Sequence, residues 1–457
     1  MKNNKTELPI YGMKKTKKIM KRLRNSVGAS NLVLYYPLSV KEASGCDITD
    51  IDGNKYLDFL AGWTVAVAGY AHPKINKSIT KEIKKRVGIS AATFPNETSV
   101  EFAEKLISIT PGNFKKKVWF GHSGTDACAA AYKMFPLATN KPRIISFHGG
   151  MHGIDVGGLA MSAIPGTAKY PIPNLVTKVP YATCYRCPFG LEYPSCNIHC
   201  ASDFIEDQVF KYTTPPEDVS FMIVEPIQSD SGDAVPPIGY LEKLKKTCDK
   251  FGILFVSDEV KIGLGRTGKM FGIEHEPNVI PDAIVLGKSL ASGIPSGALI
   301  TKSELIDSGF AGQTLSGNSI SAASGLATLD IINDEKLIDN ADKMGKYMKK
   351  RLEELMKKHE IIGDIRGRGL ILGIELVKNR KTKEPAKKET GKVVYRAWQL
   401  GLLTAFLGPN SNVIEITPPL IITSEQIDKG IEILDRALSD VKKGLVSDSD
   451  IEGFVGF

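Results

Sequence analysis

Residues 110–330 alternate between short apolar runs and longer amphipathic stretches. The apolar runs are too short for helices but typical of strands that are buried on both faces of a sheet. Between them lie segments with helical periodicity, such as residues 240–250, where Leu241, Leu244 and Cys248 share one face. The pattern predicts an α/β fold with a mostly parallel sheet flanked by helices. The expected strands are 118–120, 143–147, 221–228, 253–257, 282–286 and 296–300.

Two of these predicted strands deliver a charged residue at their carboxyl ends. Strand 253–257 leads into Asp258, and strand 282–286 is followed by Gly287 and Lys288. In open α/β sheets ligands bind beyond the carboxyl ends of the strands, so charged side chains at this edge are candidates for chemistry. A surface ion pair is the alternative. We expect Asp258 and Lys288 to belong to an active site.

Length and composition suit a globular protein with more than one domain. A chain of 457 residues is long for one simple core, and its 42% hydrophobic and 24% charged residues are ordinary proportions. Seven cysteines are few for this length and odd in number, which favours a reducing compartment such as the cytoplasm. The polar, basic start does not resemble a signal peptide, and no run approaches the roughly 20 apolar residues of a membrane span. We therefore expect no membrane partner.

Basic residues cluster between Lys14 and Arg24, although the net charge of +8 is modest for the whole chain. Neither an aromatic platform nor a base-reading motif accompanies this cluster. We expect a solvated helix face here and no nucleic-acid partner.

A phosphate-binding turn is predicted between strand 118–120 and the alanine-rich helix that follows it. The connecting residues 121–127 are Gly-His-Ser-Gly-Thr-Asp-Ala. Small residues at this position allow the backbone N–H groups and the helix dipole to stabilise a phosphate, although Ser-Gly-Thr also forms ordinary helix caps. Ser123, Gly124 and Thr125 are the candidate phosphate contacts.

These motifs, in their order along nearly the whole chain, resemble the class III (ω-) aminotransferases, a branch of the pyridoxal-phosphate (PLP) enzymes of fold type I. The resemblance rests on residues 123–127, on Asp-Glu-Val at 258–260, on Gly-Arg-Thr-Gly at 265–268 and on Gly287-Lys288. The 4-aminobutyrate and ornithine aminotransferases are of this kind. The resemblance implies a large PLP-binding domain at 71–330, a smaller α+β domain at 331–457 that the N-terminal segment 1–70 joins, and a homodimer or a dimer of dimers.

The resemblance also implies the roles of individual residues. Lys288 is expected to bind PLP covalently and to move the Cα proton of the substrate. Asp258 is expected to pair with the ring nitrogen, which makes the ring an electron sink. Further cofactor contacts implied by the family are Ser123, Gly124, Thr125, Met151, His152, Glu225, Val260, Lys261 and, across the dimer, Thr314.

Two charged residues depart from the family pattern. Lys261 stands where relatives carry a glutamine beside the phenolic oxygen of the cofactor, and it can either stabilise that oxygen or turn outward. Glu415 replaces the arginine that clamps a substrate carboxylate. Glu415 can face a substrate amine or hydroxyl, leave the carboxylate to Lys261 or Arg266, or simply face solvent or a local lysine.

Two more residues are candidate substrate contacts. Asp230 is shorter than the glutamate of relatives that use glutamate. Trp63 lies in a segment that lines the active-site entrance in the family, although a simple core tryptophan is an equal alternative.

Four cysteines, in the pattern C-x2-C-x8-C-x3-C, lie in one proline-containing segment. Thiols at such spacings can bind zinc or an iron–sulfur cluster. Similar loops occur in relatives as plain structure, so no metal is assigned. The residues are Cys184, Cys187, Cys196 and Cys200.

The function we expect is transfer of an amino group from an amine or amino acid to a 2-oxo acid. The alternative is a PLP-dependent amino-acid racemase or epimerase on the same scaffold. Residues 287–293, Asp230 and the closing residues 450–457 resemble bacterial isoleucine 2-epimerase, whereas Glu415 counts against it, because a racemase must still bind an α-carboxylate. A non-catalytic regulator is disfavoured by the presence of Lys288.

Overall fold

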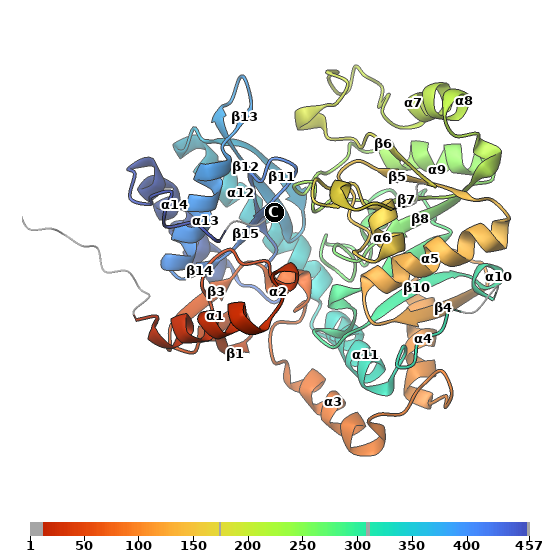
Figure 1. Cartoon of the computed structure of the whole chain (residues 1–457), viewed down its shortest axis with the longest axis horizontal. Coiled ribbons are helices and arrows are strands. Elements are labelled where there is room, and N and C mark those ends of the chain that lie inside the picture. Colours follow the sequence, from red (N-terminus) through yellow and green to blue (C-terminus); the bar gives the residue numbers. More distant parts are fainter. Residues whose placement is uncertain (1–11, 173–174, 308–310, 455–457) are drawn as a thin grey trace, which may run out of the picture.

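The computed structural model describes residues 12–172, 175–307 and 311–454 (Figure 1). The first eleven residues of the polar N-terminus and residues 455–457 of the epimerase-like closing run lie outside this part of the chain. No helix among the described residues is both long enough and apolar enough to cross a membrane.

A seven-stranded sheet forms the right-hand half of the molecule in Figure 1. Its strands run parallel except β10, which is antiparallel to both of its neighbours. The order is β4 (Lys116–Gly121), β10 (Gly297–Lys302), β9 (Ala283–Leu286), β8 (Leu254–Asp258), β7 (Val219–Val224), β5 (Arg143–Phe147) and β6 (Val176–Val179).

Helices cover this sheet and account for the unbroken apolar runs in its strands. All residues of β7 and β9 are buried. The alanine-rich helix α5 (Gly124–Thr139) packs on β4, β7, β9 and β10, and α9 (Tyr240–Phe251) packs on β8. Burial on both faces explains why these strands lack an alternating pattern. The predicted α/β class with a mostly parallel sheet is confirmed.

The sheet topology brings the predicted chemistry to one edge. The parallel strands β7, β8 and β9 end there, at Val224, Asp258 and Leu286. The antiparallel strand β10 starts at the same edge, where Gly297 pairs with Gly121 at the end of β4.

Two smaller sheets form the left-hand half in Figure 1. The N-terminal strand β3 (Lys55–Asp58) pairs in parallel with β14 (Leu402–Leu403), so the two ends of the chain share one sheet. The first sheet also contains β1 (Val40–Ser44) and β2 (Asp47–Asp50); the second contains β11 (Ile362–Arg368), β12 (Ile371–Asn379), β13 (Glu384–Pro385), β15 (Ala405–Leu407) and β16 (Val413–Ile416). The domain boundaries at residues 70 and 330 stay predictions.

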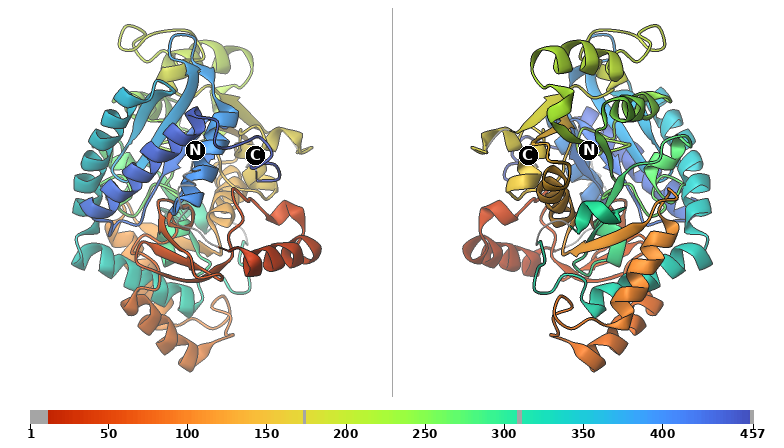
Figure 2. Two further views of the ribbon diagram at one scale, coloured as in Figure 1. Left: turned by 90° about the vertical axis from the view of Figure 1, so that its left-hand side faces the viewer. Right: turned by 90° about the vertical axis from the view of Figure 1, so that its right-hand side faces the viewer.

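Long helices complete the fold. Helix α12 (Leu337–Lys358) and α14 (Ser424–Lys442) pack together, and α14 also contacts α13 (Lys387–Gln399). Helix α11 (Ser319–Asp334) packs on α3 (Pro73–Arg86) and α4 (Glu97–Ile109). Helix α3 projects from the lower end of the molecule in both views of Figure 2.

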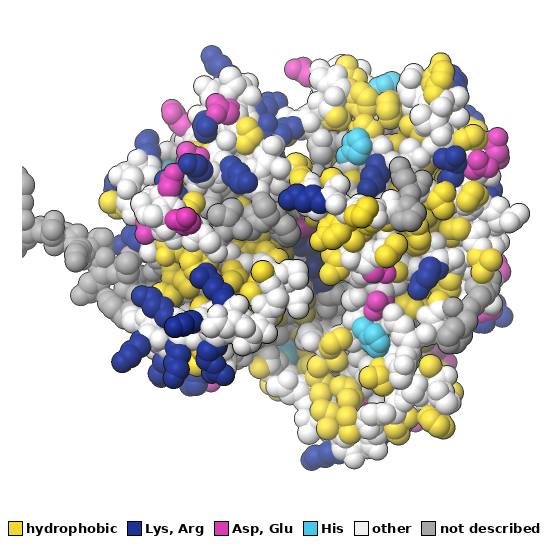
Figure 3. Space-filling model, in the orientation of Figure 1, with side chains coloured by type: hydrophobic (Ala, Val, Ile, Leu, Met, Phe, Trp, Pro, Cys, Tyr) yellow, Lys and Arg dark blue, Asp and Glu magenta, His cyan; other side chains and the backbone are white. Residues whose placement is uncertain are grey.

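The basic N-terminal cluster forms the exposed face of a helix, as predicted. Helix α1 (Lys14–Ser26) carries the lysines and arginines, and only Thr16 and Met20 among its residues are buried. In Figure 3 the Lys and Arg side chains gather over this helix at the lower left.

Two segment predictions differ from the structure. The strand expected at 221–228 ends at Val224, because Pro226 has no N–H group to continue the ladder. The basic residues and Pro385 of the segment 378–388 predict an exposed loop; most of the segment is exposed, but it is not a loop throughout. It contains the end of β12, the short strand β13 that pairs with it, and the start of α13.

A glycine in α12 gives a test of how tightly this helix packs. A Cβ at Gly345 would overlap the carbonyl of Gly369 in the turn between β11 and β12. We expect Gly345→Ala to lower the free energy of unfolding by about 1–3 kcal/mol through overpacking, although alanine normally favours a helix. Urea unfolding measures the change. Gly166→Ala is the matched control, because a Cβ there meets no heavy atom within 4 Å; equal effects of both variants would contradict the packing argument.

Candidate active site

The phosphate-loop candidate is a turn that is packed too closely for larger side chains. Ser123 caps α5 by accepting a hydrogen bond from Asp126 N at 3.2 Å, which leaves the N–H groups of Gly124 and Thr125 without a partner inside the helix. A Cβ on Gly124 would lie 2.6 Å from Val260, and a Cβ on Gly287 would lie 2.7 Å from Gly124 N. The turn is therefore clamped between the segments that follow β8 and β9.

Asp258 is held by three donors at the end of β8. Its Oδ1 accepts the N–H of Val260 at 3.0 Å, and its Oδ2 lies 2.7 Å from His152 Nδ1. The thiol of Cys128 donates to the same Oδ2 at 3.5 Å. His152 is 2% exposed, and its Nε2 has no hydrogen-bond partner among the described residues. This arrangement orients the carboxylate and stabilises its charge.

The adjacent Glu259 has a structural role. Its carboxylate accepts hydrogen bonds from the N–H groups of Gly272 at 2.7 Å and Ile273 at 2.8 Å, and from Ser257 Oγ at 3.1 Å. Burial raises the pKa of Glu259 to about 7. Only the first carboxylate of the Asp-Glu pair therefore faces the cavity.

Lys288 occupies a strained backbone position two residues after β9. Its φ of 42° lies in the left-handed region, which costs a non-glycine residue about 1–3 kcal/mol and is typical of functional sites. Burial lowers the pKa of the Lys288 amine, and the positive charge of Lys261 adds to this shift. Both effects favour the neutral amine, which is the form that attacks a carbonyl group.

Glu225 lies directly after β7 and supports the loop after β5. It accepts the N–H of Met151 at 2.9 Å and of Ser229 at 3.3 Å. Burial raises the pKa of Glu225 well above its usual range, and the charges of Asp258 and Asp230 act in the same direction. Glu225 thus fixes the backbone beside Met151 and His152.

Trp63 is presented by a left-handed turn. All four residues of the short segment α2 (Ala61–Thr64) have positive φ, at 48°, 57°, 65° and 64°. Asp58 supports the entry to this turn by accepting hydrogen bonds from Leu60 N and Tyr70 Oη, both at 2.8 Å. The half-buried indole lies 5.0 Å from the ammonium of Lys261, in a cation–π contact.

Lys261 and Glu415 form a buried ion pair. The Nζ of Lys261 lies 2.6 Å from Oε1 of Glu415 and 4.0 Å from Asp230 Oδ1. The two side chains are 6% and 0% exposed, and Ser229 Oγ donates to the same Glu415 oxygen at 3.0 Å. Neither residue faces solvent. Of the alternatives for Glu415, the structure shows the pairing with a nearby lysine.

Arg266 is not available to a substrate carboxylate. Its guanidinium is buried and donates to the carbonyl oxygens of Leu370 and Pro418. Arg266 is also absent from the described residues that line the cavity. It fastens the turn after β8 to the smaller sheets.

A cavity of about 530 Å³ joins these groups. Its size is within the usual range for small-molecule sites. Glu415 lies behind Lys261 and does not line it, and Thr314 lies on an exposed turn outside it. The predicted residues that line it are Trp63, Ser123, Gly124, Thr125, Met151, His152, Glu225, Asp230, Asp258, Val260, Lys261 and Lys288.

Sequence reasoning missed several cavity residues. Cys128 lies one helical turn after Gly124, so the phosphate-loop motif together with helical periodicity could have found it. Val33 and Val65 also line the cavity, but they come from irregular segments that carry no motif.

The residues present fit PLP on physical grounds. A helix N-terminus with free N–H groups suits a phosphate, a buried carboxylate suits a protonated ring nitrogen, and a buried neutral amine suits an aldehyde. Helix α5 provides the N-terminus, Asp258 provides the carboxylate and Lys288 provides the amine, and all three line one cavity.

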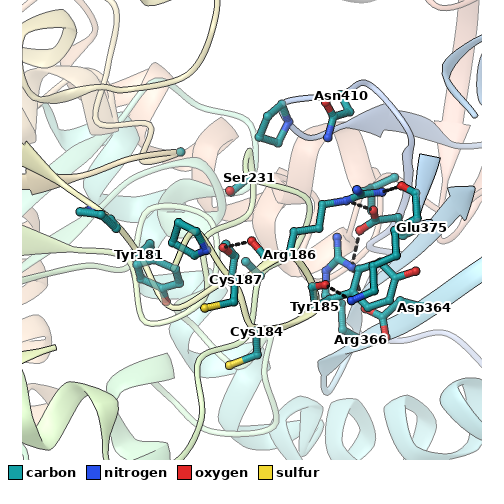
Figure 4. Close-up of a pocket in the computed structure, with 18 of the residues that line it drawn as sticks. Tyr181, Cys184, Tyr185, Arg186, Cys187, Ser231, Asp364, Arg366, Glu375 and Asn410 are labelled. Atoms are coloured by element: carbon teal, nitrogen blue, oxygen red, sulfur yellow. Dashed lines mark hydrogen bonds and ion pairs between the residues drawn. The ribbon is translucent and has the colours of Figure 1, made fainter. Parts of the chain in front are cut away.

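A second, larger cavity lies between the segment 180–193 and the strands β11 and β12 (Figure 4). Its volume is about 1020 Å³. Four of its charged side chains are paired among themselves: Glu375 accepts from Arg186 at 2.5 Å and from Arg366 at 2.7 Å, and Arg366 also pairs with Asp364 at 2.7 Å. These four side chains therefore form part of the cavity wall and are not free charged groups.

The four-cysteine segment borders this second cavity, and Cys184 and Cys187 are visible in Figure 4. Burial raises the pKa of the Cys184 and Cys200 thiols, and the charges of neighbouring thiols act in the same direction. Within the described residues, however, the one group of three or more candidate ligands at binding distance is Cys128, His152 and Asp258.

Comparison with known proteins identifies the family. The model of the family "aminotransferase class-III" matches residues 29–438. The chain belongs to this family.

Individual relatives have two kinds of activity. An alanine/serine racemase of Pyrococcus horikoshii is 38% identical over 94% of this chain and 92% of the relative. An isoleucine 2-epimerase of Lentilactobacillus buchneri is 36% identical over 97% of this chain and 99% of the relative. A solved aminotransferase structure from Bacillus anthracis has a TM-score of 0.85 at 28% identity and covers 94% of this chain and 100% of its own. The class III aminotransferase is thus a PLP-dependent enzyme of fold type I.

Breaking the buried ion pair should destabilise the protein. Lys261→Met leaves Glu415 without a cationic partner, and we expect the free energy of unfolding to fall by about 3–5 kcal/mol. Urea unfolding of the cofactor-free protein measures this without a contribution from cofactor affinity. The double variant Lys261→Met/Glu415→Leu removes both charges and should recover most of the loss. A single variant as stable as the wild type would refute the importance of this pair.

Proposed function

We propose that this class III aminotransferase uses Lys288 and Asp258 as its catalytic residues in transferring an amino group from an amine or amino acid to a 2-oxo acid. The observation that carries the proposal is the meeting of Lys288, Asp258 and the N-terminus of α5 on one cavity. PLP, when bound, withdraws electrons from the substrate Cα.

Residues of the chain bind the cofactor and transfer the proton. The amine of Lys288 would hold the cofactor through its aldehyde and would move the Cα proton of the substrate. Asp258, oriented by His152 and Cys128, would pair with the ring nitrogen. Ser123, Gly124 and Thr125 would hold the phosphate, and Met151 and Val260 would contact the ring.

Racemisation of an amino acid is the second candidate. One observation favours it: the similarity to the alanine/serine racemase and the isoleucine 2-epimerase. Both reactions begin with removal of the Cα proton by the same lysine. They differ in where the proton is returned.

We infer a homodimer in which the partner's Thr314 completes the phosphate site. Thr314 is exposed on a turn next to the start of α4, where Ser99 Oγ donates to Gly317 O at 2.6 Å. Phe94 shortly before α4 is 64% exposed and Leu315 beside Thr314 is 44% exposed, as expected for a surface that another copy covers. Seven free cysteines fit a cytoplasmic location.

One experiment separates the two reactions. The holoenzyme is mixed with single L-amino acids, first without and then with a 2-oxo acid. Amino transfer stops after one half-reaction per site when no oxo acid is present, whereas racemisation continues and generates the D-enantiomer. Chiral chromatography and assay of the new amino acid measure both. Continued D-enantiomer formation without an oxo acid would contradict the aminotransferase proposal.

Lys288→Ala should abolish either reaction. General acid–base catalysis alone contributes about 10²–10⁴-fold, so we expect kcat to fall by at least about that factor. Lys302→Ala is the matched control, because Lys302 lies at the far end of β10 and pairs with Asp282 at 2.6 Å outside the cavity. An active Lys288→Ala variant would overturn the assignment of the base.

A further inference from the structure

The ion pair between Lys261 and Glu415 bears on which substrates the cavity accepts. Lys261 and Lys288 line the cavity, and no arginine among the described residues lines it. Lys288 is needed for the chemistry, so Lys261 is the remaining cation for a substrate carboxylate. Its charge is already engaged by Glu415 at 2.6 Å.

The surroundings of the pair are acidic rather than basic. Burial acts to lower the pKa of Lys261, but the charges of Glu415, Asp230 and Asp233 outweigh it and hold that pKa above its usual value. Burial and the charge of Glu415 raise the pKa of Asp233 well above its usual range. Two carboxylates, Glu415 and Asp230, therefore lie near one ammonium here, and a second substrate carboxylate would add repulsion.

Apolar side chains also line the cavity. Trp63 covers the ammonium of Lys261 at 5.0 Å, and Val33, Val65 and Ile294 also line the cavity. The left-handed turn 61–64 fixes the indole, because Asp58 binds the backbone at its entry. Burial of a charged substrate group against these side chains would cost free energy, whereas burial of an aliphatic group is favourable because its apolar surface leaves water.

We propose that the Lys261–Glu415 pair and Trp63 determine substrate specificity, by excluding a second carboxylate and admitting amino acids with uncharged, apolar side chains. The inference rests on the proposed function, since it concerns the substrate of that same site. It predicts that neither glutamate nor its oxo acid is a partner in the reaction.

Binding of unreactive ligands tests this without any turnover. Calorimetry compares glutarate, a dicarboxylate, with 3-methylbutanoate, a monocarboxylate with an apolar branch, on the PLP-saturated enzyme. We expect the wild type to bind 3-methylbutanoate at least about tenfold more tightly than glutarate. Equal or tighter binding of glutarate would overturn the proposal. Because no chemistry is required, this outcome is distinct from a failure of amino transfer or racemisation.

Variants identify the pair as the cause. Lys261→Gln/Glu415→Arg keeps one cation but moves it to β16, and we expect its preference to shift toward glutarate by at least about tenfold. Lys302→Gln, which breaks a surface ion pair of the same length, should leave the ratio of the affinities for 3-methylbutanoate and glutarate unchanged. An unchanged ratio in the double variant would refute the proposal.

Folding of the double variant is checked separately, because a misfolded protein would bind neither ligand and the two affinities could not be compared. Far-UV circular dichroism and the absorbance of bound PLP report an intact site. If the double variant does not fold, Lys261→Met/Glu415→Leu replaces it. This variant has no charge on either residue, so its discrimination against glutarate should fall at least about threefold, and retention of the full wild-type ratio would count against the proposal.

Discussion

The active-site cavity depends on backbone segments that meet without side chains between them. Gly287, which precedes the catalytic lysine candidate, packs on the backbone of Gly124, and Gly297 at the start of β10 packs on the backbone of Ser123. Any Cβ at these glycines would push the phosphate turn away from the strands β9 and β10. Glycine is thus a steric requirement here, and the distance between the phosphate site and Lys288 follows from it.

Much of the fold was predictable because its causes are local. Strands buried on both faces must be continuously apolar, which is why 143–147 and 282–286 agree with β5 and β9 within about one residue. The position of Asp258 and Lys288 on the cavity agrees with the rule that ligands bind at the carboxyl ends of strands. The hairpin β12–β13 was missed because a two-residue strand with a proline carries almost no pattern.

The unpredicted parts of the site depend on contacts between distant segments. Lys261 follows a strand of the large sheet, whereas Glu415 lies in β16 of a smaller one, so no local signal reveals that they pair. The left-handed turn 61–64 contains alanine, tryptophan and threonine, none of which favours positive φ on its own. The hydrogen bonds that Asp58 accepts from Leu60 N and Tyr70 Oη support this conformation.

In that turn, the groups that hold the backbone in place are different from the side chain that lines the cavity. The bonds that hold it run from the Asp58 carboxylate to backbone and tyrosine groups, and from Thr417 N–H to the Phe59 carbonyl at 2.7 Å; none involves the indole of Trp63. Position 63 can therefore exchange one side chain for another while the frame beneath it stays in place. During divergence of such enzymes, the width of the substrate pocket can change at this one position without rebuilding the catalytic edge of the sheet.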